Sequence, residues 1–286
     1  MKLMKLELAG ALIVGILLFG GLNASAQAPA MQQPQTQTDK GPAPIATTPL
    51  TLNTAPPPTT AEEEAAMKAF RDASMADAAK KNQLGEDFVT KYPMSRYRVE
   101  IYSWLVKGYL GMGQVDKMEV AAEKELALQP DDATTLAIMG QTLPRAMNAS
   151  TPEPVKRLEK AEQYSKRALE LIPTLQKPAG LTDEQFATAK NQTSALAYSG
   201  LGLVAFRRGK FEDAIPNLEQ SVKLDPNPDP VNYYLLGFSD QKGSHFDDAI
   251  AAYTKCASFS GGLQQTCKAG IDQVKKLEET QLNVPR

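Results

Sequence analysis

The sequence predicts an all-α fold in which helical hairpins stack into a solenoid, because one stretch of the chain is repeated. Residues 198–226 are echoed 35 positions further on, where Asp213-Ala214-Ile215 returns as Asp248-Ala249-Ile250. Self-similarity at this period indicates an array of helical repeats. Small residues recur where two antiparallel helices would approach closely, and Pro226 follows the second helix, which it can only end. Since a single hairpin cannot bury its own apolar face, neighbouring hairpins must stack.

Each copy also carries an aromatic residue, a Leu-Gly pair, a turn, an alanine and a bulky residue at matching intervals. The first copy has Tyr198, Leu201, Gly202, Gly209, Phe211, Ala214, Leu218 and Pro226, and the second has Tyr233, Leu236, Gly237, Phe246, Ala249 and Tyr253. At these residues the chain resembles the tetratricopeptide repeat family, most clearly over residues 195–228 and 230–262. The resemblance implies a right-handed superhelix with a concave binding face and no catalytic chemistry.

Residues 1–26 have the pattern of a targeting segment. A basic start precedes an apolar run from Leu8 to Leu22, and Ala24-Ser25-Ala26 fits a cleavage site before Gln27. The run is shorter than the ~20 residues that a membrane-spanning helix needs. We therefore expect a signal peptide and an exported protein, periplasmic or secreted; an uncleaved anchor in the inner membrane is the open alternative.

Residues 27–59 are rich in Pro, Gln and Thr and are expected to form a disordered linker, since they lack apolar residues to bury. The helical repeat domain is then expected over residues 60–280, and residues 281–286 form a tail that should fray.

The repeat domain is expected to begin at Thr60-Ala-Glu-Glu63, which fits a capping box. The first hairpin should end at Tyr92-Pro93, and a second unit should run from Arg98 to Pro130. Lys81 and Gly85 depart from the repeat pattern in the first hairpin. Val106, Met118 and Ala122 do so in the second.

The middle of the domain is irregular, because residues 148–185 hold an insertion. Pro144 should end or kink a helix. Two overlong helices are expected, one from about Pro152 to Ile172 and one from a capping box at Thr182 to about Arg208. A closing helix over residues 263–279 is expected to cover the last of four to five hairpins.

No combination of residues in the sequence suggests catalysis, a cofactor or a metal site. The chain has one histidine, His245, which lies in a predicted turn. Gly200-Leu-Gly202 resembles part of a dinucleotide fingerprint but lies inside a repeat helix with no strand before it. The carboxylate pairs Glu212-Asp213 and Asp247-Asp248 stand at helix starts, where they favour the helix dipole.

The two cysteines are Cys256, in the second helix of the last repeat, and Cys267, in the closing helix. In an exported chain they either form a disulfide that pins the closing helix or remain as two buried thiols.

Eight residues fall on the concave face in the register of the family. They are Ser199, Leu203, Phe206, Arg207, Tyr234, Phe238, Gln241 and Lys242. Related proteins that grip a charged peptide terminus use Lys and Asn at positions that here carry Ser199, Leu203, Tyr234 and Phe238, so that clamp is absent. The expected ligand is an apolar or aromatic segment, and the candidate partner-binding residues are Phe206, Arg207, Tyr234, Phe238, Gln241 and Lys242. The aromatic members either form a binding groove or complete the core.

These observations predict a non-catalytic scaffold or adaptor in a bacterial periplasm or cell envelope, with a protein or peptide partner. A net charge of −2 gives no reason to expect nucleic acid binding, and a membrane is expected only if the amino-terminal segment stays uncleaved. Two alternatives remain, a membrane-anchored accessory factor for envelope assembly or export and a self-assembling structural protein. The oligomeric state stays open.

Overall fold

The computed structural model describes residues 59–282, with side chains up to residue 280. The predicted targeting segment, nearly all of the predicted linker and residues 283–286 lie outside the described residues. Within the described part the chain is helical throughout and contains no strand. The predicted all-α, tetratricopeptide-like repeat fold is therefore confirmed.

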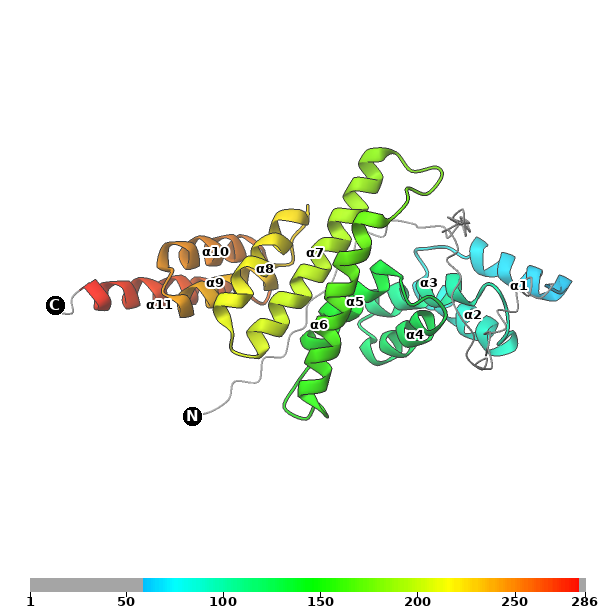
Figure 1. Cartoon of the computed structure of the whole chain (residues 1–286), viewed down its shortest axis with the longest axis horizontal. Coiled ribbons are helices and arrows are strands. Elements are labelled where there is room, and N and C mark those ends of the chain that lie inside the picture. Colours follow the sequence, from blue (N-terminus) through cyan, green and yellow to red (C-terminus); the bar gives the residue numbers. More distant parts are fainter. Residues whose placement is uncertain (1–58, 283–286) are drawn as a thin grey trace, which may run out of the picture.

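The helices follow one another along the long axis of the molecule, from the amino-terminal hairpin at one end to the closing helix at the other (Figure 1). They are α1 (Ala61–Asp72), α2 (Ala78–Lys91), α3 (Arg98–Gly111), α4 (Val115–Leu128), α5 (Ala133–Arg145), α6 (Pro154–Leu171), the short 3-10 helix η1 (Ile172–Thr174), α7 (Asp183–Arg207), α8 (Phe211–Leu224), α9 (Pro230–Gly243), α10 (Phe246–Ser258) and α11 (Gln264–Leu282).

The predicted helix boundaries agree with the structure where capping residues mark them. The Thr182 hydroxyl accepts from the Gln185 N–H at 3.1 Å, and the Gln185 amide oxygen accepts from the Thr182 N–H at 2.9 Å, so this capping box is complete. The Thr60 hydroxyl likewise accepts from the Glu63 N–H. The buried Glu63 carboxylate, however, accepts from Ser95, which ties the start of α1 to the loop after α2. Helix α5 ends one residue after Pro144, as expected.

Lys81, which departs from the repeat pattern, has a specific structural place in the first hairpin. Its buried ammonium donates to the carbonyl oxygens of Arg71 and Ala73, which end α1. The same ammonium lies 5.1 Å from the ring centroid of Phe70 and 4.9 Å from that of Trp104. One side chain of α2 thus joins α1 and α3, and burial lowers the pKa of Lys81.

The interior of each later hairpin depends on a glycine that faces a larger side chain. A Cβ at Gly202 would lie 2.7 Å from the Leu218 side chain, and one at Gly237 would lie 2.9 Å from the Tyr253 ring. In the α3–α4 hairpin the equivalent positions hold Val106 and Ala122, both fully buried in one core cluster. The first helix of this hairpin thus carries a larger side chain than the usual glycine, and the second helix carries a smaller one than the usual bulky residue. The two changes compensate and keep the space between the helices filled.

The insertion lengthens α6 and α7, which cross the long axis and extend beyond their neighbours (Figure 1). Three helices meet tightly where α5, α6 and α7 cross. A Cβ at Gly200 would lie 2.7 Å from the Gly140 carbonyl oxygen and 2.4 Å from the Ser165 hydroxyl. Only glycine allows backbones to approach this closely.

Helix α11 closes the array by packing on the last hairpin. A Cβ at Gly270 would lie 2.8 Å from the Tyr253 ring, so this ring is held between Gly237 and Gly270. A disulfide joins Cys256 to Cys267, with 5.9 Å between their Cα atoms. Among the described helices, none has the length and apolar character to cross a membrane.

Candidate partner-binding surface

The six candidate partner-binding residues lie on α7 and α9, in the two clearest repeats, but they are not equally accessible. Arg207 and Lys242 are exposed, whereas Phe206, Tyr234 and Phe238 are half-buried. Gln241 is buried, and its amide oxygen accepts from the Tyr253 hydroxyl at 3.1 Å. The structure therefore leaves Arg207 and Lys242 exposed and the three aromatic rings partly exposed, whereas it turns the Gln241 amide inward.

Two of the predicted concave positions, both on α7, are filled by contacts between helices. Leu203 and Ser199 are both buried. Ser199 accepts from the Gln141 amide at 3.0 Å and donates to the Asn232 amide oxygen at 2.8 Å, while the Asn232 amide nitrogen donates to Ser221 at 3.1 Å. This polar chain links α5, α7, α9 and α8 and fixes their relative positions. The accessible part of the surface therefore lies toward the ends of α7 and α9.

At those ends, three rings form what we call the phenylalanine cluster, Phe206 of α7, Phe211 of α8 and Phe238 of α9. Their ring centroids are 5.4 to 5.6 Å apart in edge-on or tilted arrangements, which aromatic pairs prefer. All three rings are half-buried. Phe211 was not among the predicted partner-binding residues, although its place at the start of the second helix, matched by Phe246 one repeat later, could have indicated it.

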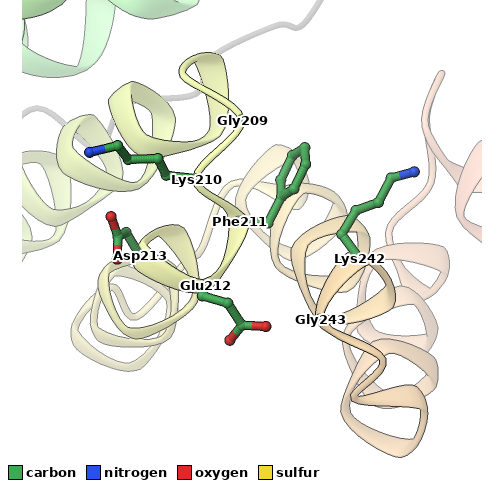
Figure 2. Close-up of a pocket in the computed structure, with 7 residues that line it drawn as sticks. All are labelled: Gly209, Lys210, Phe211, Glu212, Asp213, Lys242 and Gly243. Carbon is green, nitrogen blue, oxygen red and sulfur yellow. The ribbon is translucent and has the colours of Figure 1, made fainter.

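Beside the phenylalanine cluster is an open pocket of about 380 Å³. Figure 2 shows it between the α7–α8 turn, the first turn of α8 and the end of α9. It is lined by Gly209, Lys210, Phe211, Glu212, Asp213, Lys242 and Gly243. Gly209 has a φ of +73°, a left-handed conformation that glycine adopts without strain, and a Cβ there would meet open space.

Among the basic residues of this region, Lys242 lies next to a ring of the phenylalanine cluster. The Lys242 ammonium lies 5.2 Å from the Phe238 ring centroid, in cation–π geometry. The Arg207 guanidinium donates at 3.1 Å to the carbonyl oxygens of Pro144 and Met147, near the end of α5. Within the described part of the chain, none of Arg207, Lys210 and Lys242 forms an ion pair with a carboxylate.

The single histidine lies near Glu212, one of the residues that line this pocket. His245 stands immediately before α10, with Nδ1 3.6 Å from a carboxylate oxygen of Asp240 and Nε2 4.0 Å from one of Glu212. Burial, followed by the nearby charge of Asp248, raises the pKa of Asp240 to about 6. His245 thus lies in a turn between the carboxylates of Asp240 on α9 and Glu212 on α8. In residues 59–282 no group of three or more His, Cys, Asp or Glu side chains is arranged to hold a metal ion.

The profile of the tetratricopeptide repeat family matches residues 195–228, the first of the two clear repeats. A comparison with curated proteins gives no match. Similar solved structures include a tetratricopeptide repeat protein of Thermus thermophilus, with 17% identity, coverage of 74% of this chain and 98% of that one, and a TM-score of 0.45. Another is PilW, a type IV pilus biogenesis factor, with 17% identity, coverage of 77% and 90%, and a TM-score of 0.46.

Proposed function

We propose that the protein is a non-catalytic scaffold, exported to the periplasm or cell envelope of a bacterium, which binds a segment of a partner protein. The observation that carries the proposal is the surface formed by Phe206, Tyr234 and Phe238, together with exposed Arg207 and Lys242, on adjacent repeats. Grouped aromatic side chains that stay partly exposed mark interaction surfaces, and aromatics and arginine are enriched among the residues that dominate binding energy.

Two features support the exported location. The sequence of residues 1–26 has the layout of a signal peptide, and a structural disulfide such as Cys256–Cys267 is favoured by an oxidising compartment. The mature protein should begin at Gln27, which sequencing of the amino terminus would test. An intact Met1 terminus in the membrane fraction would favour the anchored accessory factor instead.

The binding function is tested by affinity purification with the full chain and identification of the captured protein by mass spectrometry. Replacing Tyr234 and Phe238 together by Ala should abolish capture. Because both rings are half-buried and contact one another, thermal melting of the same variant must be measured alongside. The matched control replaces exposed Val120 and Val155, on α4 and α6, by Ala and should leave capture unchanged. A Tyr234→Ala, Phe238→Ala variant that is folded and still captures the partner would exclude this surface.

A further inference from the structure

We propose that the phenylalanine cluster and Lys242 bind a protein segment in which an aromatic side chain lies between carboxylates. The proposal rests on the proposed function and adds the place of binding and the chemistry of the partner. The place is the edge of the array where hairpin turns lie, rather than the buried concave positions around Ser199 and Leu203.

The geometry of the three rings favours an aromatic side chain in the partner. They belong to three helices and two hairpins, and each ring packs against the other two while part of it stays exposed. An incoming aromatic ring can therefore add to an existing set of edge-on contacts without moving the backbone. The adjacent pocket has glycine at Gly209, where a Cβ would meet open space, so no side chain at this position obstructs the approach of a peptide backbone.

The charge of the partner follows from how the pocket side chains point. In Figure 2 the Phe211 ring and the Lys242 side chain extend toward the same side, whereas Glu212 points the other way. The Glu212 carboxylate lies near His245 and against the backbone of Gly243. The cation next to the aromatic wall is thus Lys242, with no carboxylate partner among residues 59–282. Charge complementarity favours a carboxylate in the partner, next to its aromatic residue.

The probe is a pair of fluorescein-labelled peptides with a tryptophan flanked by two glutamates in one and by two lysines in the other. Fluorescence anisotropy with the full-length mature protein measures both affinities. The acidic peptide should bind at least about tenfold more tightly, and its advantage should shrink as salt is raised, since exposed charges are screened. Equal binding of the two peptides, or tighter binding of the basic one, would overturn the proposal.

Two variants locate the binding site. Phe211→Ala and Lys242→Glu should each weaken binding of the acidic peptide about tenfold or more. Phe246→Ala is the matched control for the ring, because Phe246 holds the same position at the start of α10. Lys255→Glu, on the exposed face of α10, is the matched control for the charge. Lys242 is itself exposed, so its reversal tests the site even if Phe211→Ala impairs folding.

The outcomes separate this inference from the proposed function. If Phe211→Ala and Lys242→Glu bind the acidic peptide as well as the wild type does, the site is wrong. If the protein captures a partner in the affinity experiment but does not bind the acidic peptide, the inference fails while the scaffold function stands.

Discussion

The hairpins α3–α4 and α9–α10 bury a side chain at the same repeat position, but Glu125 stands there in the first and Cys256 in the second. Both side chains are fully buried. Cys256 makes a covalent link to α11, the next helix of the array. Glu125 instead contacts α5, the helix that follows α4, by accepting one hydrogen bond from the Thr135 hydroxyl at 2.7 Å. Its other carboxylate oxygen has no hydrogen-bond partner among the described residues.

The same position is held by Ala168 in α6 and by Ser221 in α8, and both are buried. Phe88 holds this position in α2 and is also buried. Five different residues therefore fill one repeat position, where each second helix contacts the helix that follows. The comparison teaches that a repeat position fixes where contact occurs, while the residue fixes the kind and strength of the contact and its dependence on pH or redox state.

The largest effect is expected for the disulfide between Cys256 and Cys267. Replacing Cys256 and Cys267 together by Ala should lower the free energy of unfolding by about 3 kcal/mol, because the crosslink closes a short loop in the unfolded chain. In an array whose repeats contact only their neighbours, the loss should first appear as faster hydrogen exchange in α11. Thiol labelling of the unreduced, denatured wild type should find no free thiol, and two labelled cysteines would contradict the disulfide.

The next largest effect concerns the alanine that lets the two helices of a hairpin approach. Ala214 is fully buried, with 0% of its surface accessible to solvent. Ala214→Leu should cost roughly 2 kcal/mol through overpacking. Met118 holds the equivalent position in α4, so Met118→Leu, which conserves volume, is the matched control and should cost less than about 1 kcal/mol. An unchanged melting curve for Ala214→Leu would contradict the repeat register.

A smaller effect, with a pH dependence, is expected at Glu125. Burial, with the charge of Asp132 adding to it, raises the pKa of Glu125 from 4.5 to about 7. Between these values the unfolded chain loses the proton while the folded protein keeps it, so stability falls as pH rises through this window and the loss persists above pH 7. Glu125→Gln should therefore gain roughly 1–2 kcal/mol at pH 8 and nothing near pH 4.

Chemical unfolding at a series of pH values measures the gain for Glu125→Gln. The matched control is Glu159→Gln, at an exposed position of α6, which should show no comparable trend. A Glu125→Gln variant whose advantage over the wild type does not change with pH would show that the buried carboxyl titrates normally.

The comparison also shows why the sequence predicts some features and misses others. The Thr182 capping box, the helix end at Pro144 and the two clear repeats depend on neighbours in the sequence, and all were predictable. The buried state of Glu125 depends on side chains of three helices, so no local pattern reveals it. Similarly, the pairing of Gly270 with the Tyr253 ring becomes visible only once α11 is placed on the last hairpin.

For the candidate partner-binding surface as well, the sequence predicted some contacts and missed others. The family register predicted Phe206 and Phe238 on one face of the array, and their ring centroids lie 5.4 Å apart. It did not reveal that Gln241 turns inward to Tyr253 or that Phe211 completes the ring cluster. Those contacts depend on the volumes of neighbouring side chains, which differ from one repeat to the next.

The smallest effect is expected at Ser221, where the same repeat position forms two neutral hydrogen bonds. The Ser221 hydroxyl donates to the Ala195 carbonyl oxygen at 2.9 Å and accepts from the Asn232 amide at 3.1 Å. Ser221→Ala should cost about 1 kcal/mol, the usual net value for losing such bonds in a buried site. Ser258→Ala, which removes an exposed hydroxyl bonded to its own helix, is the matched control and should be nearly neutral. Because Asn232 belongs to the following hairpin, the loss should appear as faster hydrogen exchange at the start of α9, with α3 and α4 unaffected. If Ser221→Ala leaves both the free energy of unfolding and the exchange rates unchanged, the hydrogen bonds from Gln141 to Ser221 add no stability beyond apolar packing. A buried alanine such as Ala168 would then be sufficient at this repeat position.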